Sequence, residues 1–317
     1  MPEQVTSSHG ESKIAVIAAI LGNAAVAAVK FFAAAMTGSS AMISEGIHSL
    51  VDMGNGGLLF LGINRSQKPP DSSHPFGNGK ELYFWSLIVA ISVFGIGGGA
   101  SMYEGITHIV RPSPLESATI SYIVLGLAFV FEGISWLIAW KQFRLQRGGR
   151  RTWPAIKHGK DPAIFMVVFE DSAALVGLVV AFLGVFLGHQ LKNPYFDGGA
   201  SVVIGLLLAT VAVWLAYKSR ELLVGESAGD DVLVSITHVA EADPDVISAG
   251  PALTMYLGPR EALLNLSVQF RPGLPVEDVH RAVHRMEQGI GALHPDITRI
   301  YIEVEEPEEG EGPAAPE

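Results

Sequence analysis

The chain has 317 residues, of which 49% are hydrophobic and 17% are charged, and its formal net charge is −11. Its mean hydropathy of +0.35 is high for a soluble protein, so an integral membrane protein is the first class to consider. No cysteine is present, which excludes disulfides and thiolate metal sites.

Six apolar runs are long enough to cross a bilayer, which requires about 20 helical residues. They cover residues 14–35, 41–63, 83–109, 120–140, 163–187 and 199–217. The third run is rich in glycine, which membrane helices tolerate because small residues let backbones approach closely. The first ten residues lack a basic segment and no cleavage signature ends the first run, so we expect an uncleaved helix there. The sequence predicts an α-helical membrane domain over residues 1–224.

Basic residues in the connections between these runs predict the orientation of the chain. The connection after the fourth run carries Lys141, Arg144, Arg147, Arg150, Arg151, Lys157 and Lys160, and the connection after the second carries Arg65, Lys68 and Lys80. The connection after the first run carries none, and those after the third and fifth carry only Arg111 and Lys192. Because basic loops stay in the cytoplasm, we expect both termini to be cytoplasmic.

Three ionisable residues, Glu45, His48 and Asp52, interrupt the second run. On a helix they lie within an arc of roughly 60°, so their side chains can point at one place. They could simply form hydrogen bonds across a helix interface. However, a carboxylate inside a membrane costs about 2.5 to 3.5 kcal/mol on insertion scales, and two beside an imidazole are a poor choice for packing alone. The spacing therefore favours a functional site.

The fifth run contains a second acidic pair, Glu170 and Asp171. Adjacent helical residues are about 100° apart, so only one of the two can face a given partner squarely. The small residues Ala174 and Gly177 lie near Asp171 on its helix and allow close approach to another helix. We expect the second and fifth helices to meet at a site of one imidazole and two to four carboxylates.

One nitrogen and several oxygens suit a divalent transition metal. Zinc is the leading candidate, and cobalt, iron, nickel and manganese remain open. An imidazole ordinarily titrates near pH 6.5, so it can exchange a proton for a metal in the physiological range. Proton antiport is therefore the natural coupling.

Other polar residues carry weaker expectations. Lys30 and Glu104 are close enough to the ends of their helices to reach the interface, whereas Glu132 is nearer mid-helix and is expected to be buried and paired. In the loop before the third helix, Asp71 and His74 can bind a metal, but Asp in a Pro-rich loop also shapes turns. The sequence leaves these two alternatives open.

The last part of the chain is acidic and has soluble patterning. From Glu226 onward there are 18 acidic and 5 basic residues, net −13, against net +2 before it. The patterning predicts a helix over 230–241, an extended segment over 245–257, a strand over 264–270, a helix from Pro275 and a strand over 300–304. The helix is expected to present Val276, Val279, Val283, Met286 and Ile290 on one face. We therefore expect a small α+β domain of order α-β-β-α-β over residues 225–306, and a disordered acidic tail over 307–317.

Three segments together resemble the cation diffusion facilitator family, in particular its branch with the mitochondrial zinc transporter. They are "TGSSAMISEGIHSLVD", "HPFGNGKELYFWS" and "VVFEDSAALVGL". The resemblance implies a homodimer, alternating access and export of divalent metal driven by protons. It also implies a regulatory and dimerisation role for the C-terminal domain. The expected partners are thus a second copy of the chain, the lipid bilayer and divalent metal ions, and no nucleic acid.

The resemblance also suggests which residues bind the metal. The family's motif on the second helix maps onto His48 and Asp52, and Asp171 matches on the fifth. The position four residues before Asp171 is Val167, which cannot ligate, so Glu170 or Glu45 is expected to supply the fourth ligand. In the loop site Asp71 and His74 match, but the third ligand would be Asn78. In the C-terminal domain, His280 and His284 lie four residues apart, a spacing that could bind metal. Without clear partner ligands, we interpret them as surface or dimer-contact residues.

The leading hypothesis is therefore a proton-coupled zinc transporter in a bacterial inner membrane. A membrane-embedded metal sensor or scaffold without vectorial transport is the alternative. A membrane metallohydrolase is disfavoured because His48 is the only well-placed histidine in the predicted membrane runs and no nucleophile motif accompanies it. We expect the chain not to be an enzyme.

Overall fold

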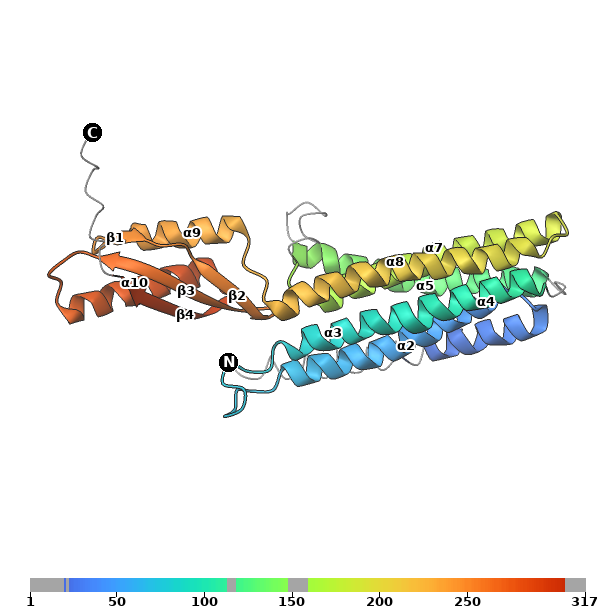
Figure 1. Ribbon diagram of the computed structural model, residues 1–317, viewed down its shortest axis with the longest axis horizontal. Helices are drawn as coiled ribbons and strands as arrows, with labels where there is room; N and C mark the ends of the chain where they lie inside the picture. Colours follow the sequence, from blue (N-terminus) through green and yellow to red (C-terminus); the bar gives the residue numbers. More distant parts are fainter. Residues whose placement is uncertain (1–19, 21–22, 113–117, 148–158, 306–317) are drawn as a thin grey trace, which may run out of the picture. The chain divides into compact units, whose positions relative to one another are not determined.

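The computed structural model describes residues 20, 23–112, 118–147 and 159–305. The chain forms two compact units. The first comprises Met1–Lys68 and Glu81–Arg220, and the second comprises Pro69–Lys80 and Glu221–Glu317 (Figure 1). The predicted acidic tail, 307–317, and residues 14–19 and 21–22 of the first predicted span lie outside the described residues.

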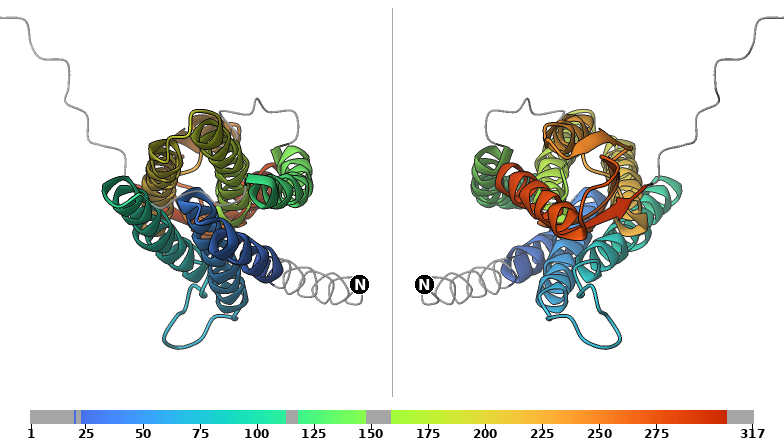
Figure 2. Two further views of the ribbon diagram at one scale, coloured as in Figure 1. Left: turned by 90° about the vertical axis from the view of Figure 1, so that its right-hand side faces the viewer. Right: turned by 90° about the vertical axis from the view of Figure 1, so that its left-hand side faces the viewer.

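The first unit is a bundle of long helices (Figure 2). Its elements are a helix over Asn23–Thr37, then α2 (Ser40–Ser66), α3 (Glu81–Ser92), the π-helical segment η1 (Val93–Gly98), α4 (Gly99–Val110), α5 (Ala118–Arg147), α7 (Pro162–Gln190) and α8 (Tyr195–Val224). The helix α2 packs against α3, α4 and α7, and α5 packs against α7.

Among the described residues, 4 helices are long and apolar enough to cross a membrane. They are Glu81–Val110, Thr119–Lys141, Phe165–Gln190 and Tyr195–Val224. The helix Asn23–Thr37 is apolar but shorter in its described part. With 27 residues α2 is long enough, but Glu45, Asp52 and other polar residues lower its hydropathy. The predicted total of six spans is therefore established only in part.

Glycine lets α4 and α8 approach closely, as the composition of the third run predicts. A Cβ added to Gly105 would lie 2.7 Å from both the carbonyl oxygen of Gly198 and the amide nitrogen of Val202. A Cβ on Gly98 would lie 3.2 Å from the carbonyl oxygen of Gly205. The predicted helix 83–109 is also interrupted by the π-helical segment where its glycines cluster, because glycine adds no side chain to hold a regular helix there.

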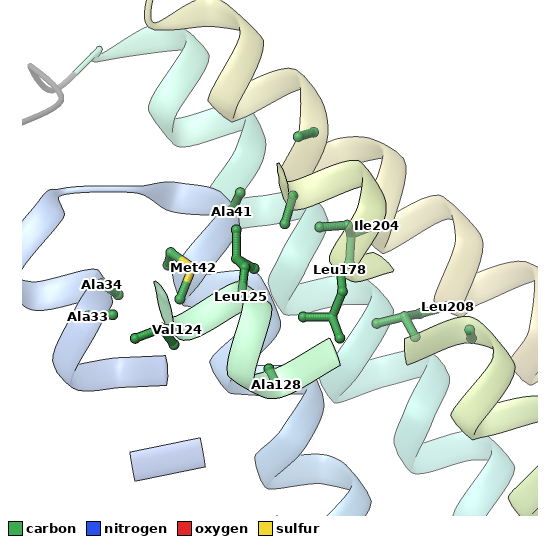
Figure 3. Packing of buried hydrophobic residues seen from close by; sticks show 13 residues of the cluster. Ala33, Ala34, Ala41, Met42, Val124, Leu125, Ala128, Leu178, Ile204 and Leu208 are labelled. Atoms are coloured by element: carbon green, nitrogen blue, oxygen red, sulfur yellow. The ribbon is translucent and has the colours of Figure 1, made fainter. Parts of the chain in front are cut away.

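Small and branched aliphatic side chains fill the centre of the bundle (Figure 3). This core cluster joins the helix Asn23–Thr37 to α2, α5, α7 and α8, and it includes Ala33, Ala41, Met42, Leu125, Ala128, Leu178, Ile204 and Leu208. Several of these side chains are alanines, so the helix backbones lie close together. The polar residues of α2 are thereby held inside the bundle.

The second unit contains α9 (Asp230–Glu241), β1 (Val246–Ala249), β2 (Leu253–Gly258), β3 (Glu261–Phe270), α10 (Val276–Leu293) and β4 (Ile297–Val304). The central strand β3 pairs antiparallel with β1 and β2 and parallel with β4. Because β1 and β2 pair with different parts of β3, they share one of its edges. The alternate residues of β3 from Ala262 to Phe270 are buried against α9 and α10.

Two details of the predicted C-terminal domain are wrong. The order is α-β-β-β-α-β, because Gly250 and Pro251 divide the predicted extended segment 245–257 into two strands. Proline has no amide hydrogen to donate to a sheet. Val276, predicted on the buried face of α10, is the first residue of this helix and is 80% exposed. The fully buried residues of α10 are Ala282, Met286 and Ile290.

The loop Pro69–Lys80 belongs to the second unit, although the sequence placed it within the membrane domain. A Cβ on Gly79 would lie 2.3 Å from the carbonyl oxygen of Leu257, so only glycine fits this contact. Lys80 Nζ lies 3.7 Å from Met255 Sδ, and the Arg299 guanidinium lies 5.2 Å from the centre of the Phe76 ring. The loop is thus held against β2 and β4.

Candidate functional site

The centre of the candidate site is a buried His48–Asp52 pair on α2. Their spacing of four residues places them one turn apart, and His48 Nδ1 lies 3.5 Å from Asp52 Oδ1. The side chains are 2% and 14% exposed. Among the described residues, neither His48 nitrogen nor Asp52 Oδ1 has a hydrogen-bond partner. Buried polar atoms without partners are costly, so the pair is a candidate for binding a ligand.

The adjacent residues Glu170 and Asp171 on α7 turn to different helices, as their angular separation predicts. Glu170 Oε1 accepts a hydrogen bond of 3.0 Å from Asn55 Nδ2 on α2. Asp171 Oδ2 accepts one of 3.0 Å from Ser135 Oγ on α5. Glu170 therefore connects α7 to the helix that carries His48 and Asp52, and Asp171 faces the neighbouring α5.

These carboxylates share one electrostatic environment. Asp52 interacts with the charges of Glu132 and Asp171, and Glu170 interacts with those of Asp52 and Asp171. Such a gathering of negative charge inside a bundle attracts a cation or protons. Within the described ranges, however, no three acidic or histidine side chains converge into a ready ligand shell. Ligation by Asp171 would require its side chain to turn from Ser135 towards α2.

Glu45 makes different contacts from His48 and Asp52. Its Oε2 lies 3.1 Å from Lys30 Nζ, and Lys30 also donates a 2.8 Å hydrogen bond to Ser49 Oγ. Lys30 Nζ lies 3.6 Å from Glu132 Oε1. Lys30 is therefore fully buried rather than extended to an interface, because two carboxylates solvate its ammonium inside the bundle. The prediction that Glu132 is buried and paired is confirmed.

Val167 packs against an apolar cluster formed by Ala139, Phe143 and Val168. It lies one turn before Asp171 and, like Asp171, faces α5. The position that carries a ligand in the family motif is therefore part of the hydrophobic packing between α5 and α7.

The loop residues Asp71 and His74 are exposed, and Asp71 shapes a turn. Its Oδ1 accepts backbone hydrogen bonds of 2.7 Å from His74 and 2.8 Å from Ser73. These two bonds lower the pKa of the Asp71 carboxyl. His74 Nδ1 lies 3.4 Å from the same oxygen. The turn accounts for Asp71, and a metal site there stays a prediction.

The sequence did not single out Asp197 on α8, which is fully buried. Its carboxylate accepts hydrogen bonds from Ser39 Oγ (2.7 Å) and from the backbone amides of Ser40 (2.6 Å) and Ala41 (3.3 Å). Asp197 thus caps the N-terminus of α2 from another helix. Asp197 lies just before the predicted sixth run, outside the predicted helix. The one available signal in the sequence was a charged residue next to an apolar run.

In the C-terminal unit, His280 and His284 are exposed on α10. His284 contacts Gln288 at 2.9 Å and Glu287 at 3.7 Å on its own helix. These contacts agree with the interpretation of the pair as surface residues.

A family model described as the cation efflux transmembrane domain matches residues 16–224. The chain is 36% identical to the mitochondrial proton-coupled zinc antiporter SLC30A9 of Mus musculus over 239 residues, which are 75% of this chain and 42% of that protein. It is 29% identical to metal tolerance protein C4 of Arabidopsis thaliana over 288 residues, 90% of this chain and 62% of that protein. It is 25% identical to the cation-efflux pump FieF of Klebsiella pneumoniae over 278 residues, 87% of each chain.

The chain spans about half the length of the zinc antiporters that it matches. The family match covers well over half of the chain and includes His48, Asp52, Glu170 and Asp171. The resemblance found in the sequence is therefore confirmed, and the chain belongs to the cation efflux family, also called the cation diffusion facilitator family.

Proposed function

We propose that the chain is an antiporter that exports a divalent transition metal, with zinc as the first candidate, in exchange for protons. The observation that carries the proposal is the buried His48–Asp52 pair beside the carboxylates of α7. Both His48 nitrogens and Asp52 Oδ1 lack hydrogen-bond partners among the described residues. The mouse and Klebsiella relatives, a proton-coupled zinc antiporter and a cation-efflux pump, support the same function.

The proposed ligands are His48, Asp52 and Asp171, with Glu170 as the fourth. Imidazole and carboxylate ligands bind a metal only when deprotonated, so binding releases protons and protonation releases the metal. Turning α2 and α7 relative to each other would open the site to alternate sides of the membrane. Such alternating access requires helices that slide without losing contact, and the small residues along α7 and α8 permit this.

We also propose a homodimer in a bacterial inner membrane, with the C-terminal unit in the cytoplasm as a regulatory and dimerisation domain. The basic connections after α2 and α5 support this orientation. The mouse relative is named as mitochondrial, so the similarity itself supports a membrane location and not a particular membrane.

Transport in liposomes tests the proposal. The purified chain is reconstituted around a zinc-sensitive dye under an imposed pH gradient, and we expect zinc uptake that depends on the gradient. Asp52→Ala and Asp171→Ala should each lower the rate at least about tenfold, since each removes a proposed ligand. Glu104→Gln, which changes a carboxylate outside the site, is the matched control and should transport like the parent.

Equal transport by the parent and both alanine variants would contradict the site assignment. Zinc binding by the parent without uptake would contradict transport and favour the metal sensor or scaffold instead.

A further inference from the structure

Lys30 places a fixed positive charge inside the bundle next to the candidate cation site. Its side chain is completely buried, and its ammonium contacts Glu45 and Ser49 on α2 and Glu132 on α5. An ammonium in such surroundings is stable only when carboxylates and hydroxyls replace its hydration. Lys30 thereby connects its own helix, Asn23–Thr37, to the helix that carries His48 and Asp52.

Glu45 is held between Lys30 and α7. Its Oε2 lies 3.1 Å from Lys30 Nζ, and its Oε1 lies 2.7 Å from the place that a Cβ on Gly177 would occupy. The missing side chain of Gly177 therefore makes the room that the carboxylate fills. In this position Glu45 makes no contact with His48 or Asp52 that would count as a hydrogen bond among the described residues.

The charge of Lys30 acts on the site directly. Lys30 interacts electrostatically with both His48 and Asp52. Without Glu45, the ammonium would keep only Glu132 and Ser49 as partners, and its charge would repel an incoming divalent cation more strongly. Without Lys30, Glu45 would attract one. The opposite charges of Lys30 and Glu45 cancel each other's influence on the cation only while the two side chains are paired.

We infer that Lys30 and Glu45 form a charge-neutral positioning pair for the cation site: Lys30 holds Glu45 out of the ligand set, and Glu45 screens the ammonium from the bound cation. The inference rests on the proposed function for the nature of the cation. It assigns Glu45 as a counter-ion and leaves the ligand positions to His48, Asp52, Glu170 and Asp171.

The pair predicts shifts of opposite sign in zinc affinity. Glu45→Gln removes one of the two carboxylates that face the ammonium and should weaken zinc binding. Lys30→Met leaves the Glu45 carboxylate without its ammonium and should tighten it. Each shift should be about tenfold or more, because the charge lies within one or two helical turns of the site. The double variant Lys30→Met/Glu45→Gln removes both charges and should return to within about threefold of the parent.

Calorimetric titration of the purified full chain in detergent with zinc alone measures these affinities, and size-exclusion chromatography checks that each variant is folded. Glu104→Gln is the control for the loss of a carboxylate elsewhere and should bind like the parent. If Glu45 is a ligand, Glu45→Gln and the double variant will lose affinity equally, and this result would overturn the inference. Unchanged affinity in both single variants would overturn it as well.

The double variant alone decides the matter if a single variant does not fold. Zinc affinity equal to that of the parent then supports the inference, because removing both opposite charges leaves the net charge near the cation unchanged. A large loss of zinc affinity contradicts it. The liposome assay separates the two proposals. Opposite affinity shifts without zinc uptake would support the positioning pair and refute transport. Zinc uptake without opposite affinity shifts would support transport and refute the positioning pair. A parent that binds no zinc would refute both.

Discussion

Buried carboxylates in this chain replace lost hydration in different ways. Asp197 accepts backbone amide hydrogens at the start of α2, Glu45 pairs with Lys30, and Asp243 accepts bonds from Arg285. Asp52 has a neighbouring imidazole but no hydrogen bond to Oδ1 among the described residues. The first three have charged or backbone donors within the protein, although Glu45 Oε1 has no hydrogen-bond partner among the described residues. Asp52 is the carboxylate for which we propose a cation as the partner.

Asp243 allows the structural solution to be tested. Its two oxygens accept bonds of 2.7 and 2.8 Å from Arg285, which lower the pKa of the Asp243 carboxyl from its ordinary 3.8. A lowered pKa in the folded state adds stability above the unfolded value and loses it as the pH falls through the folded value. Asp243→Asn should therefore destabilise the C-terminal unit by about 1–2 kcal/mol at pH 7. The effect should shrink as the pH falls below the ordinary pKa of 3.8 and vanish below the lower pKa of the folded state.

Hydrogen exchange of β1 and α10 peptides in the full chain, with parent and variant compared at the same pH, measures this difference. Asp278→Asn is the control, because Asp278 contacts Arg281 on the surface of α10, where an ion pair contributes about 0–1 kcal/mol. An equal effect of both substitutions at pH 7 would show that the Asp243–Arg285 pair has no special role.

At the scale of elements, glycine lets α4 and α8 pack closely together. Gly105 faces the backbone of Gly198 and Val202, and Gly205 faces Met102, whose Cγ lies 2.4 Å from the position of an added Cβ. Neither helix carries the proposed ligands. The contact therefore contributes to the packing of the bundle outside the proposed site.

Gly105→Ala tests the importance of this contact. The added Cβ would overlap the backbone of α8, and overpacking of this kind costs about 1–3 kcal/mol, so we expect a lower midpoint of thermal unfolding in detergent. Gly126→Ala on α5 is the matched control, because nothing lies within 4 Å of a Cβ there. An unchanged midpoint for Gly105→Ala would mean that α8 shifts freely to make room.

Local patterns in the sequence predicted the elements better than the contacts between them. Apolar composition placed α5, α7 and α8 to within several residues, since it is this composition that a membrane span requires. The division of β1 from β2 was missed although Pro251 is visible. The partner of Glu45 could not be predicted, because the spacing of Glu45, His48 and Asp52 describes one helix and the position of Lys30 depends on how a second helix is rotated.

At the scale of the whole molecule, the loop Pro69–Lys80 restricts the membrane topology. It contacts β2 and β4 within the second unit, so the loop and the C-terminal domain must lie on the same side of the membrane. Between Lys80 and Glu221, 4 apolar helices are found among the described residues. An even number of crossings returns the chain to its starting side, which agrees with this requirement and with the basic residues around the loop.

Cysteine labelling tests this topology, and the absence of native cysteine makes the chain a clean background. Ser73→Cys in the loop, Val276→Cys on α10 and Leu191→Cys after α7 are all at exposed positions. In cells, a maleimide that cannot cross membranes should label only Leu191→Cys from outside, because three crossings separate it from the loop. Inverted vesicles should give the opposite pattern. Labelling of Ser73→Cys and Val276→Cys from different sides would exclude the contact between the loop and the sheet.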